Sequence, residues 1–220
     1  MTYAIQIREE SFQLHYSGAL FWENESLLMM SDVHLGKISH FRKYGAAVPQ
    51  HALLRNFETM DTAIAQFDPK HVVFMGDLFH SSLNKEWGLF EEWVGQKKMQ
   101  LTLVEGNHDI ISPVKYEALG IKVTPEFSLG NFFMTHHPEE REGQFNFSGH
   151  LHPAVRLTGL GRQSVCLRCF YKSSVQMILP AMGEFTGSHT MAVTKDSEVF
   201  AILGDTVLPV QIHKQKSKFQ

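Results

Sequence analysis

Five short polar clusters contain residue types that bind divalent metal ions. In chain order they are Asp32-Val33-His34, Gly76-Asp77, Gly106-Asn107-His108-Asp109, Thr135-His136-His137 and Gly149-His150-Leu151-His152. They offer carboxylate, imidazole and amide donors and no thiolate, which favours a borderline-hard ion such as Mn²⁺, Fe or Zn²⁺. Each cluster alone is common in turns. All five together, in this order, predict a site for two divalent ions.

The spacing within the clusters predicts how the ligands divide. Side chains two apart on extended backbone point the same way, so Asp32 and His34 should reach one cavity together, as should His150 and His152. We expect Asp77 to be shared by both ions. The predicted ligands are Asp32, His34 and His152 for one ion, and Asn107, His136 and His150 for the other.

Two such ions, ~3.5–4 Å apart, are typical of phosphoester hydrolysis. Their charge acidifies a bridging water into a nucleophilic hydroxide and offsets charge on the phosphoryl oxygens. His108 is predicted to lie over the phosphate, as a general acid or a cationic stabiliser. Asp109 is predicted to fix the tautomer of His108 through its other ring nitrogen. Because adjacent strand residues face opposite ways, His136 is the expected ligand, and His137 is expected to meet substrate or solvent.

Basic residues close to the first cluster are candidate substrate contacts. Lys37, Arg42 and Lys43 would either touch a phosphate backbone beside the ions or form an ordinary solvated loop. The sequence does not decide between these interpretations. Weaker candidates for the same contact are Arg141, Arg156 and Arg168.

Strands that end at the clusters must position these groups. Apolar runs at 27–30, 72–75 and 101–104 end at the first three clusters. Such runs are typical of strands buried on both faces, and the strand ends of open α/β sheets form a ligand-binding rim. Apolar residues at three- and four-residue steps predict helices over Pro49–Phe67 and Lys85–Lys97.

The second half of the chain is predicted to be mainly strands. The predicted segments are Phe132–Thr135, Gln144–Ser148, Val155–Thr158, Ser164–Tyr171, Val175–Leu179, Met191–Thr194 and Val199–Leu203. Alternating helices and strands followed by strands indicate an α/β fold of two stacked mixed sheets with helices outside.

Composition restricts the class of protein. The 220 residues suit one domain, predicted over 1–212, with a polar basic tail at 213–220. A net charge of -3 argues against a strongly basic groove, so nucleic acid would need a local patch. Cys166 and Cys169 cannot support a disulfide-built fold, and in a strand their thiols should pack separately on opposite faces. No signal peptide or membrane span is recognisable, so a cytoplasmic location is expected.

The five clusters resemble the motifs of the calcineurin-like metallophosphoesterase superfamily, which run D-x-H, G-D, G-N-H-D/E, H and G-H-x-H. The match extends from Asp32 to His152. The resemblance implies a four-layer αββα sandwich, in which two stacked mixed sheets are flanked by helices and the two ions lie at one rim. It implies the same roles for the matching positions.

The flanking sequence is similar to the ligase-associated DNA damage response endonuclease (PdeM) family. The residues that carry this resemblance are Ser31–Lys37, Phe41–Gly45, Pro49, Leu167–Phe170 and Leu179–Gly187. Met182 departs from the expected phenylalanine. The resemblance implies a Mn²⁺-dependent phosphodiesterase that cuts DNA during repair, with single-stranded DNA as the expected substrate. It also implies a functional association with an ATP-dependent DNA ligase, a helicase and an exonuclease.

Two alternative functions remain open from the sequence. The same site would serve a phosphodiesterase or phosphomonoesterase acting on small nucleotides; a closed pocket would favour a nucleotide, and an open groove DNA. A non-catalytic scaffold is the third interpretation, but no metal-ligand position is missing.

Overall fold

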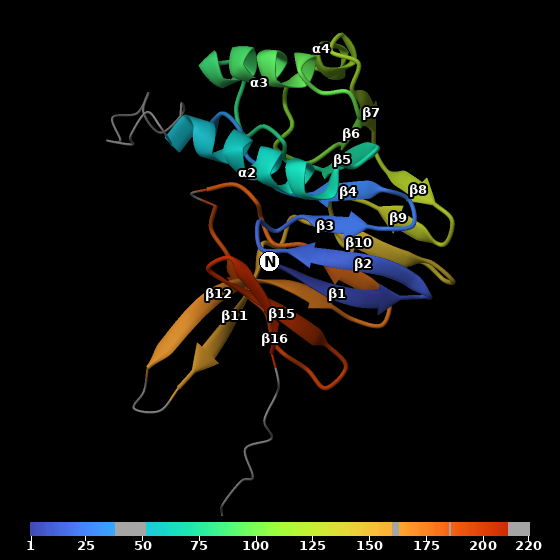
Figure 1. Ribbon diagram of the computed structural model, residues 1–220, viewed down its shortest axis with the longest axis vertical. Helices are drawn as coiled ribbons and strands as arrows, with labels where there is room; N and C mark the ends of the chain where they lie inside the picture. Colours follow the sequence, from blue (N-terminus) through green and yellow to red (C-terminus); the bar gives the residue numbers. More distant parts are fainter. Residues whose placement is uncertain (38–51, 160–162, 185, 211–220) are drawn as a thin grey trace, which may run out of the picture.

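Two β-sheets stack face to face in the computed structural model, which describes residues 1–37, 52–159, 163–184 and 186–210 (Figure 1). The first sheet has the strand order β1-β2-β3-β4-β5-β6-β7. Its strands are β1 (Thr2–Ile7), β2 (Glu10–His15), β3 (Leu20–Trp22), β4 (Leu27–Met30), β5 (His71–Met75), β6 (Gln100–Val104) and β7 (Lys122–Thr124). β1 to β4 pair antiparallel, whereas β4 to β7 pair parallel.

The second sheet has the order β14-β11-β12-β13-β10-β9-β8, and β15 pairs with both β12 and β16. Its strands are β8 (Phe127–Leu129), β9 (Phe132–Met134), β10 (Phe145–Ser148), β11 (Pro153–Thr158), β12 (Ser164–Lys172), β13 (Gln176–Ile178), β14 (His189–Thr190), β15 (Glu198–Leu203) and β16 (Thr206–Pro209). It also mixes parallel and antiparallel pairs. The predicted class, α/β with two stacked mixed sheets, is confirmed.

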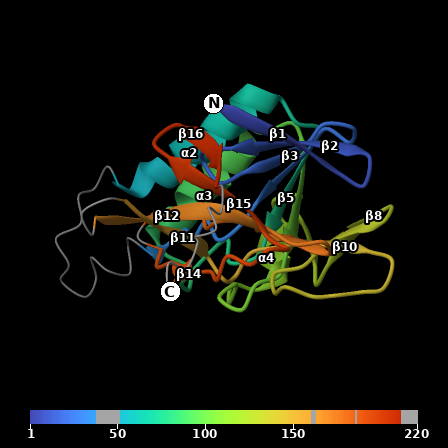
Figure 2. The ribbon, with the colours of Figure 1, turned by 90° about the horizontal axis from the view of Figure 1, so that it is seen from below.

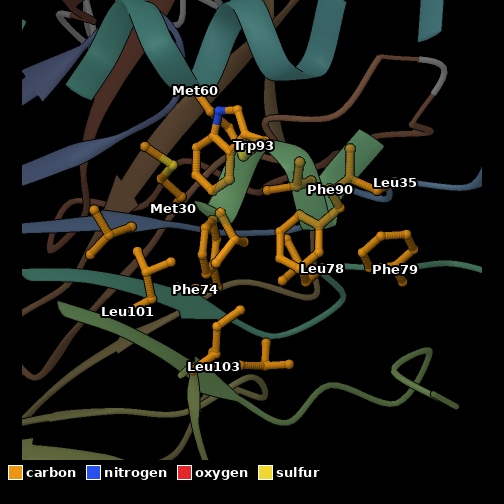
Figure 3. Close-up of a cluster of buried hydrophobic side chains, with 14 of the residues drawn as sticks. Met30, Leu35, Met60, Phe74, Leu78, Phe79, Phe90, Trp93, Leu101 and Leu103 are labelled. Atoms are coloured by element: carbon orange, nitrogen blue, oxygen red, sulfur yellow. The ribbon is translucent and has the colours of Figure 1, made fainter. Parts of the chain in front are cut away.

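The central strands are buried on both faces, as their continuous apolar sequence predicts. Leu28 and Met30 of β4 face the helices, whereas Leu27 and Met29 face the second sheet. Figure 3 shows Met30 within the helix-side cluster, which also includes Phe74, Met60 and Trp93. This double burial fixes the strand register, and therefore fixes where each strand ends.

In the described part of the chain, three helices lie against the outer face of the first sheet (Figure 1). They are α2 (Ala52–Phe67), α3 (Lys85–Gly95) and α4 (Pro113–Glu117). α2 ends where Asp68 adopts a left-handed φ of 44° and donates its N–H to Ile64 O at 2.8 Å, directly before Pro69. Asn84 caps α3 by accepting from the Glu86 N–H at 2.8 Å. The predicted helix start at Pro49 and the tail at 213–220 lie outside the described residues.

Several sequence predictions need correction. The predicted strand Met191–Thr194 is wrong, because the strand in this region is β14, which ends at Thr190. Two further strands, β8 and β16, were not predicted. Helices cover one sheet in the described ranges, and the outer face of the second sheet carries only a small apolar cluster around Val155 and Cys169. Cys169 is buried but Cys166 is exposed, so only one thiol is packed. No helix in the described ranges is long and apolar enough to cross a bilayer.

Candidate metal centre

The five polar clusters meet at one edge of the two sheets. Each of five candidate ligands comes from a loop that follows a different strand, β4, β5, β6, β9 or β10; these ligands are Asp32, Asp77, Asn107, His136 and His150. Contacts of 2.9–3.4 Å join residues from different loops in this group. The prediction that strand ends build the site therefore agrees with the structure.

The loops after β4 and β5 run side by side because backbone pairing continues past the strand ends. The Asp32 N–H donates to Gly76 O at 3.2 Å, and the His34 N–H donates to Asp77 O at 3.0 Å. Leu35 and Phe79 form a parallel bridge one step further on. The register of two buried strands thus sets the positions of Asp32, His34 and Asp77.

Five candidate ligands adopt left-handed backbone conformations. Asp32, His34, Asp77, His150 and His152 have φ values of 52°, 52°, 51°, 63° and 48°. Such values are uncommon for residues with a Cβ and concentrate at functional sites. Asp32 and His34 share one ligand group, as predicted for this pair, whereas His150 and His152 fall in different groups. The predicted reason is wrong, because their backbone is locally left-handed and not extended.

Two glycines permit the close approach of these loops. A Cβ at Gly149 would lie 1.7 Å from Ser31 Oγ and 2.4 Å from Asp32 Oδ2. A Cβ at Gly76 would lie 2.2 Å from His136 Nδ1, and Gly76 has a φ of 81°. Any side chain at either position would push a candidate ligand out of place.

Asp32, His34 and His152 form the first ligand group, with donor atoms all within 4.8 Å of one another. His152 Nδ1 lies 3.1 Å from Gly187 O, a carbonyl that can only accept, so the proton is on Nδ1. His152 Nε2 lies 3.1 Å from Asp32 Oδ1. Both atoms are buried and lack a hydrogen-bond partner in the described ranges. Two buried metal-binding atoms that lie this close together without a partner fit a shared cation.

Asn107, His136 and His150 form the second ligand group. His136 Nδ1 lies 3.1 Å from Met75 O and donates to it, which leaves Nε2 as the free acceptor. That Nε2 lies 2.9 Å from Asn107 Oδ1 and 3.2 Å from His150 Nδ1. An imidazole whose other nitrogen donates to a backbone carbonyl is the usual arrangement of a metal-binding histidine.

Asp77 lies between the two groups. Its Oδ2 is 3.4 Å from His34 Nε2 in the first group, and its Oδ1 is 3.4 Å from His136 Nε2 in the second. The backbone N–H of His108 also donates to Oδ1 at 2.8 Å. One oxygen facing each group is the geometry of a carboxylate that bridges two ions.

The protonation states of these groups suit metal binding. Burial lowers the pKa of His34 and of His150, and keeps both imidazoles in the neutral form that binds metals. Burial alone would raise the pKa of Asp77. Hydrogen bonding to His34, the positive charge that the His136 ring has when protonated, and the His108 N–H outweigh burial and hold that pKa at about 2. Asp77 is therefore ionised at neutral pH.

His108 and Asp109 differ in their surroundings. His108 is exposed at the rim, above the buried ligands. The Asp109 carboxylate accepts the N–H of Phe79 at 3.0 Å and the N–H of Gly106 at 2.9 Å. Burial raises its pKa to about 6. Its hydrogen bonds thus hold the 106–109 turn against the loop after β5, instead of fixing the His108 ring as predicted.

The remaining predicted residues surround this centre. His137 is exposed, and its ring centroid is 4.0 Å from that of His150. His136, His137 and His150 form a third group with donor atoms within 4.8 Å, because the two adjacent histidines lie past the end of β9, where strand alternation no longer applies. Lys37 is half-buried, and burial lowers its pKa against the attraction of Asp77. The candidates Arg42 and Lys43 lie outside the described residues.

Comparison with known proteins identifies the family. The family model of the calcineurin-like phosphoesterases matches residues 26–162, a range that contains all five clusters. The chain belongs to the calcineurin-like phosphoesterase family. It is therefore a metal-dependent phosphoesterase, and the paired ligand groups are the expected metal-binding residues of such an enzyme.

Solved structures show the fold of this phosphoesterase. The nuclease MPE of Pseudomonas putida is similar with a TM-score of 0.78 and 24% identity, over 96% of this chain and 100% of that one. A conserved uncharacterized protein of Streptococcus pneumoniae has a TM-score of only 0.32 and 13% identity, over 79% of this chain and 80% of that one. No curated protein matches the chain.

Sequence reasoning missed three residues that support the site of this phosphoesterase. Thr186 Oγ1 lies 3.0 Å from His34 Nδ1 and orients that ring. His80 lies beside His108, with ring centroids 4.3 Å apart, and burial and the neighbouring His108 lower its pKa to about 4. Asn56 is buried and donates to Val33 O at 3.0 Å. Asn56 lies four positions before the core residue Met60, on the same face of the helix. A polar residue at such a position could have been recognised from the sequence.

Proposed function

We propose that this phosphoesterase is an endonuclease that hydrolyses phosphodiester bonds in single-stranded DNA. The observation that carries the proposal is the shape of the site. Four candidate ligands are at most 2% exposed, namely Asp32, His34, Asp77 and His136. Asn107, His108 and His137 of the same loops are exposed to solvent in the described part of the chain. A polymer can lie across such an exposed edge, whereas a small nucleotide is normally enclosed by its pocket.

The depth of the ligands supports an unpaired strand as the substrate. The scissile phosphate must descend below the exposed rim to reach groups that are almost fully buried. A single strand can bend its backbone into such a recess, while a duplex must first be opened or deformed. The name of the Pseudomonas putida neighbour, a nuclease, agrees with a polymeric substrate.

Two divalent ions, Mn²⁺ in the first instance, are proposed as the cofactor, because the donors are carboxylate, imidazole and amide. Held by these residues, such ions would lower the pKa of a bound water and offset negative charge on phosphoryl oxygens. The exposed imidazole of His108 is proposed to protonate the leaving oxygen. The backbone N–H of His108 donates to Asp77 Oδ1 at 2.8 Å and holds this residue beside the ligands. The half-buried Lys37 is proposed to bind a flanking phosphate.

The similarity to the PdeM family gives the proposal its biological setting. The segment Leu179–Gly187, which carries part of this similarity, contacts the loop that holds Asp32. The Met182 N–H donates to Ser31 O and the Gly183 N–H donates to Asp32 O, both at 3.0 Å. This contact gives a physical reason for the segments Ser31–Lys37 and Leu179–Gly187 to occur together. We propose a cytoplasmic role in DNA repair, in functional association with an ATP-dependent DNA ligase, a helicase and an exonuclease.

A substrate comparison tests the proposal. The purified chain with Mn²⁺ is given circular single-stranded DNA, linear duplex DNA and cyclic nucleotides, with Asp77→Asn as the control for contaminating nucleases. Cutting of the circular single strand by the wild type alone is the expected result, because a circle offers no end. Hydrolysis of the cyclic nucleotides with intact DNA would contradict the proposal and favour a nucleotide phosphodiesterase.

A further inference from the structure

The β11–β12 hairpin begins at the metal centre and projects away from the body of the protein. Pro153, the first residue of β11, directly follows the candidate ligand His152. Figures 1 and 2 show the hairpin extending beyond the neighbouring strands, at the opposite end of the second sheet from β8. Its strands pair in antiparallel register, with Arg156 opposite Cys166 and Ala154 opposite Arg168.

The two faces of this hairpin can be assigned from strand alternation. Phe170 of β12 faces the core between the sheets, whereas Cys169 belongs to the apolar cluster on the outer face. Even-numbered residues of β12 therefore lie on the inner face, together with their cross-strand partners on β11. Beyond the core, this inner face consists of exposed polar or small residues: Arg156, Thr158, Ser164, Cys166 and Arg168. We call these five residues the hairpin inner face.

The arginines of the chain differ in what they already bind. Arg168 donates to Ala181 O at 2.7 Å, and Arg141 pairs with Glu126 and with Glu139, each at 2.8 Å. Arg156 is exposed and makes no hydrogen bond or ion pair with any residue in the described ranges. Neither β11 nor β12 contains an aspartate or a glutamate. Arg156 is thus a cation without a local counter-charge.

We propose that the hairpin inner face binds the phosphate backbone of the DNA strand that is cut at the metal centre, with Arg156 as the principal contact. This inference rests on the proposed function and extends it to a second binding surface. Arg156 is four residues beyond His152 on β11, so the two Cα atoms are at most about 13 Å apart. A guanidinium suits a phosphate because it donates two parallel hydrogen bonds. The hydroxyls of Thr158 and Ser164 add donors on the same face.

Substitutions at Arg156 test the surface. We compare Arg156→Ala, Arg156→Lys and the control Lys122→Ala, which removes an exposed cation from the far edge strand β7. The substrates are a 20-nucleotide oligo(dT) and bis(p-nitrophenyl) phosphate, both with Mn²⁺. For Arg156→Ala, the ratio of kcat/KM on DNA to kcat/KM on the small diester should fall about three- to tenfold, as expected for one lost phosphate contact. The slope of log affinity for DNA against log salt should fall in magnitude by about 0.7.

The controls separate charge from folding. Arg156→Lys should keep the wild-type salt slope, since the charge is retained, and Lys122→Ala should keep the wild-type ratio. Arg156→Glu should lower the ratio further than Arg156→Ala. Equal ratios and equal salt slopes for Arg156→Ala and Lys122→Ala would overturn the inference.

Failure of the proposed function would look different. In that case the wild type would hydrolyse the small diester and leave every DNA substrate intact. Strand length gives a second measurement: wild-type kcat/KM should rise once the strand is long enough to reach Arg156, and this rise should be smaller in Arg156→Ala. An identical length dependence in both proteins would also overturn the inference.

Discussion

Asn56 connects the two loops that hold the first ligand group. Its side chain is 2% exposed, its Nδ2 donates to Val33 O at 3.0 Å, and its Oδ1 accepts the Glu184 N–H at 3.1 Å. Val33 lies between two candidate ligands, and Glu184 lies close before Thr186, which orients the His34 ring. We therefore expect Asn56 to position the metal ligands without touching the ions.

The size of the effect follows from the two hydrogen bonds. Asn56→Ala leaves a buried carbonyl and a buried N–H without their partners, at about 1–3 kcal/mol each. The folded state should therefore lose about 2–6 kcal/mol, less whatever water recovers. The freed loops no longer fix His34, and loss of such an outer-shell contact lowers metal affinity about 10–100-fold. Asn56→Asp keeps the acceptor but turns a carboxylate oxygen toward Val33 O, so it should be at least as harmful.

Calorimetric titration with Mn²⁺ and urea unfolding, each with and without Mn²⁺, measure the two effects separately. The matched control is Thr59→Ala, which removes an exposed hydroxyl of the same helix that bonds Arg55 O. Asn56→Ala should bind Mn²⁺ more weakly than both the wild type and the control. If Asn56→Ala is destabilised but binds Mn²⁺ with wild-type affinity, the proposed link between α2 and the metal centre is wrong.

Four further predictions concern the site and the core. Asp77→Ala should reduce turnover more than any other ligand replacement, because it faces both groups, and near-normal turnover would contradict the bridging role. His108→Ala should lower the hydrolysis rate about 10²–10⁴-fold, with two Mn²⁺ per chain retained by elemental analysis; loss of the metal would refute its role as an acid. Gly149→Ala should abolish Mn²⁺ binding in titration while circular dichroism still reports a folded chain, since its Cβ would meet Ser31 Oγ at 1.7 Å. His15 is buried, and burial, then the N-terminal charge, lowers its pKa from 6.5 to about 4. As the pH falls, His15 is protonated in the unfolded chain before it is protonated in the folded protein. The contribution of His15 to the free energy of unfolding should therefore be complete above pH 6.5 and be lost between pH 6.5 and 4. Urea unfolding across this pH range measures the loss, and His15→Gln should reduce it.

The sequence predicted the location of the site because buried strands have a recognisable pattern. Strands such as β4 and β5 are apolar on both faces, so their ends can be read directly from the sequence, and the polar clusters follow those ends. The strands β4, β5 and β6 were found in this way. Shorter strands such as β8 and β14 were missed or misplaced, because two or three residues give too little periodicity to detect.

The local geometry of the site could not be predicted by the same reasoning. The left-handed backbone at Asp32 and His150 violates the usual preference of residues with a Cβ, and only the packed loops around them impose it. The exposure of Cys166 depends on how far the hairpin projects, which no local pattern encodes. The contacts of Asn56 and Thr186 join positions more than 120 residues apart. Such contacts exist only after the two sheets have stacked.

Asp77 is expected to lie between two metal ions. The most direct test of this expectation is the anomalous scattering of Mn²⁺ in a crystal soaked with manganese. The account predicts two peaks about 3.5–4 Å apart, one beside Asp32, His34 and His152 and the other beside Asn107, His136 and His150. A map with no peak in this cavity, or with one ion that does not contact Asp77, would contradict it.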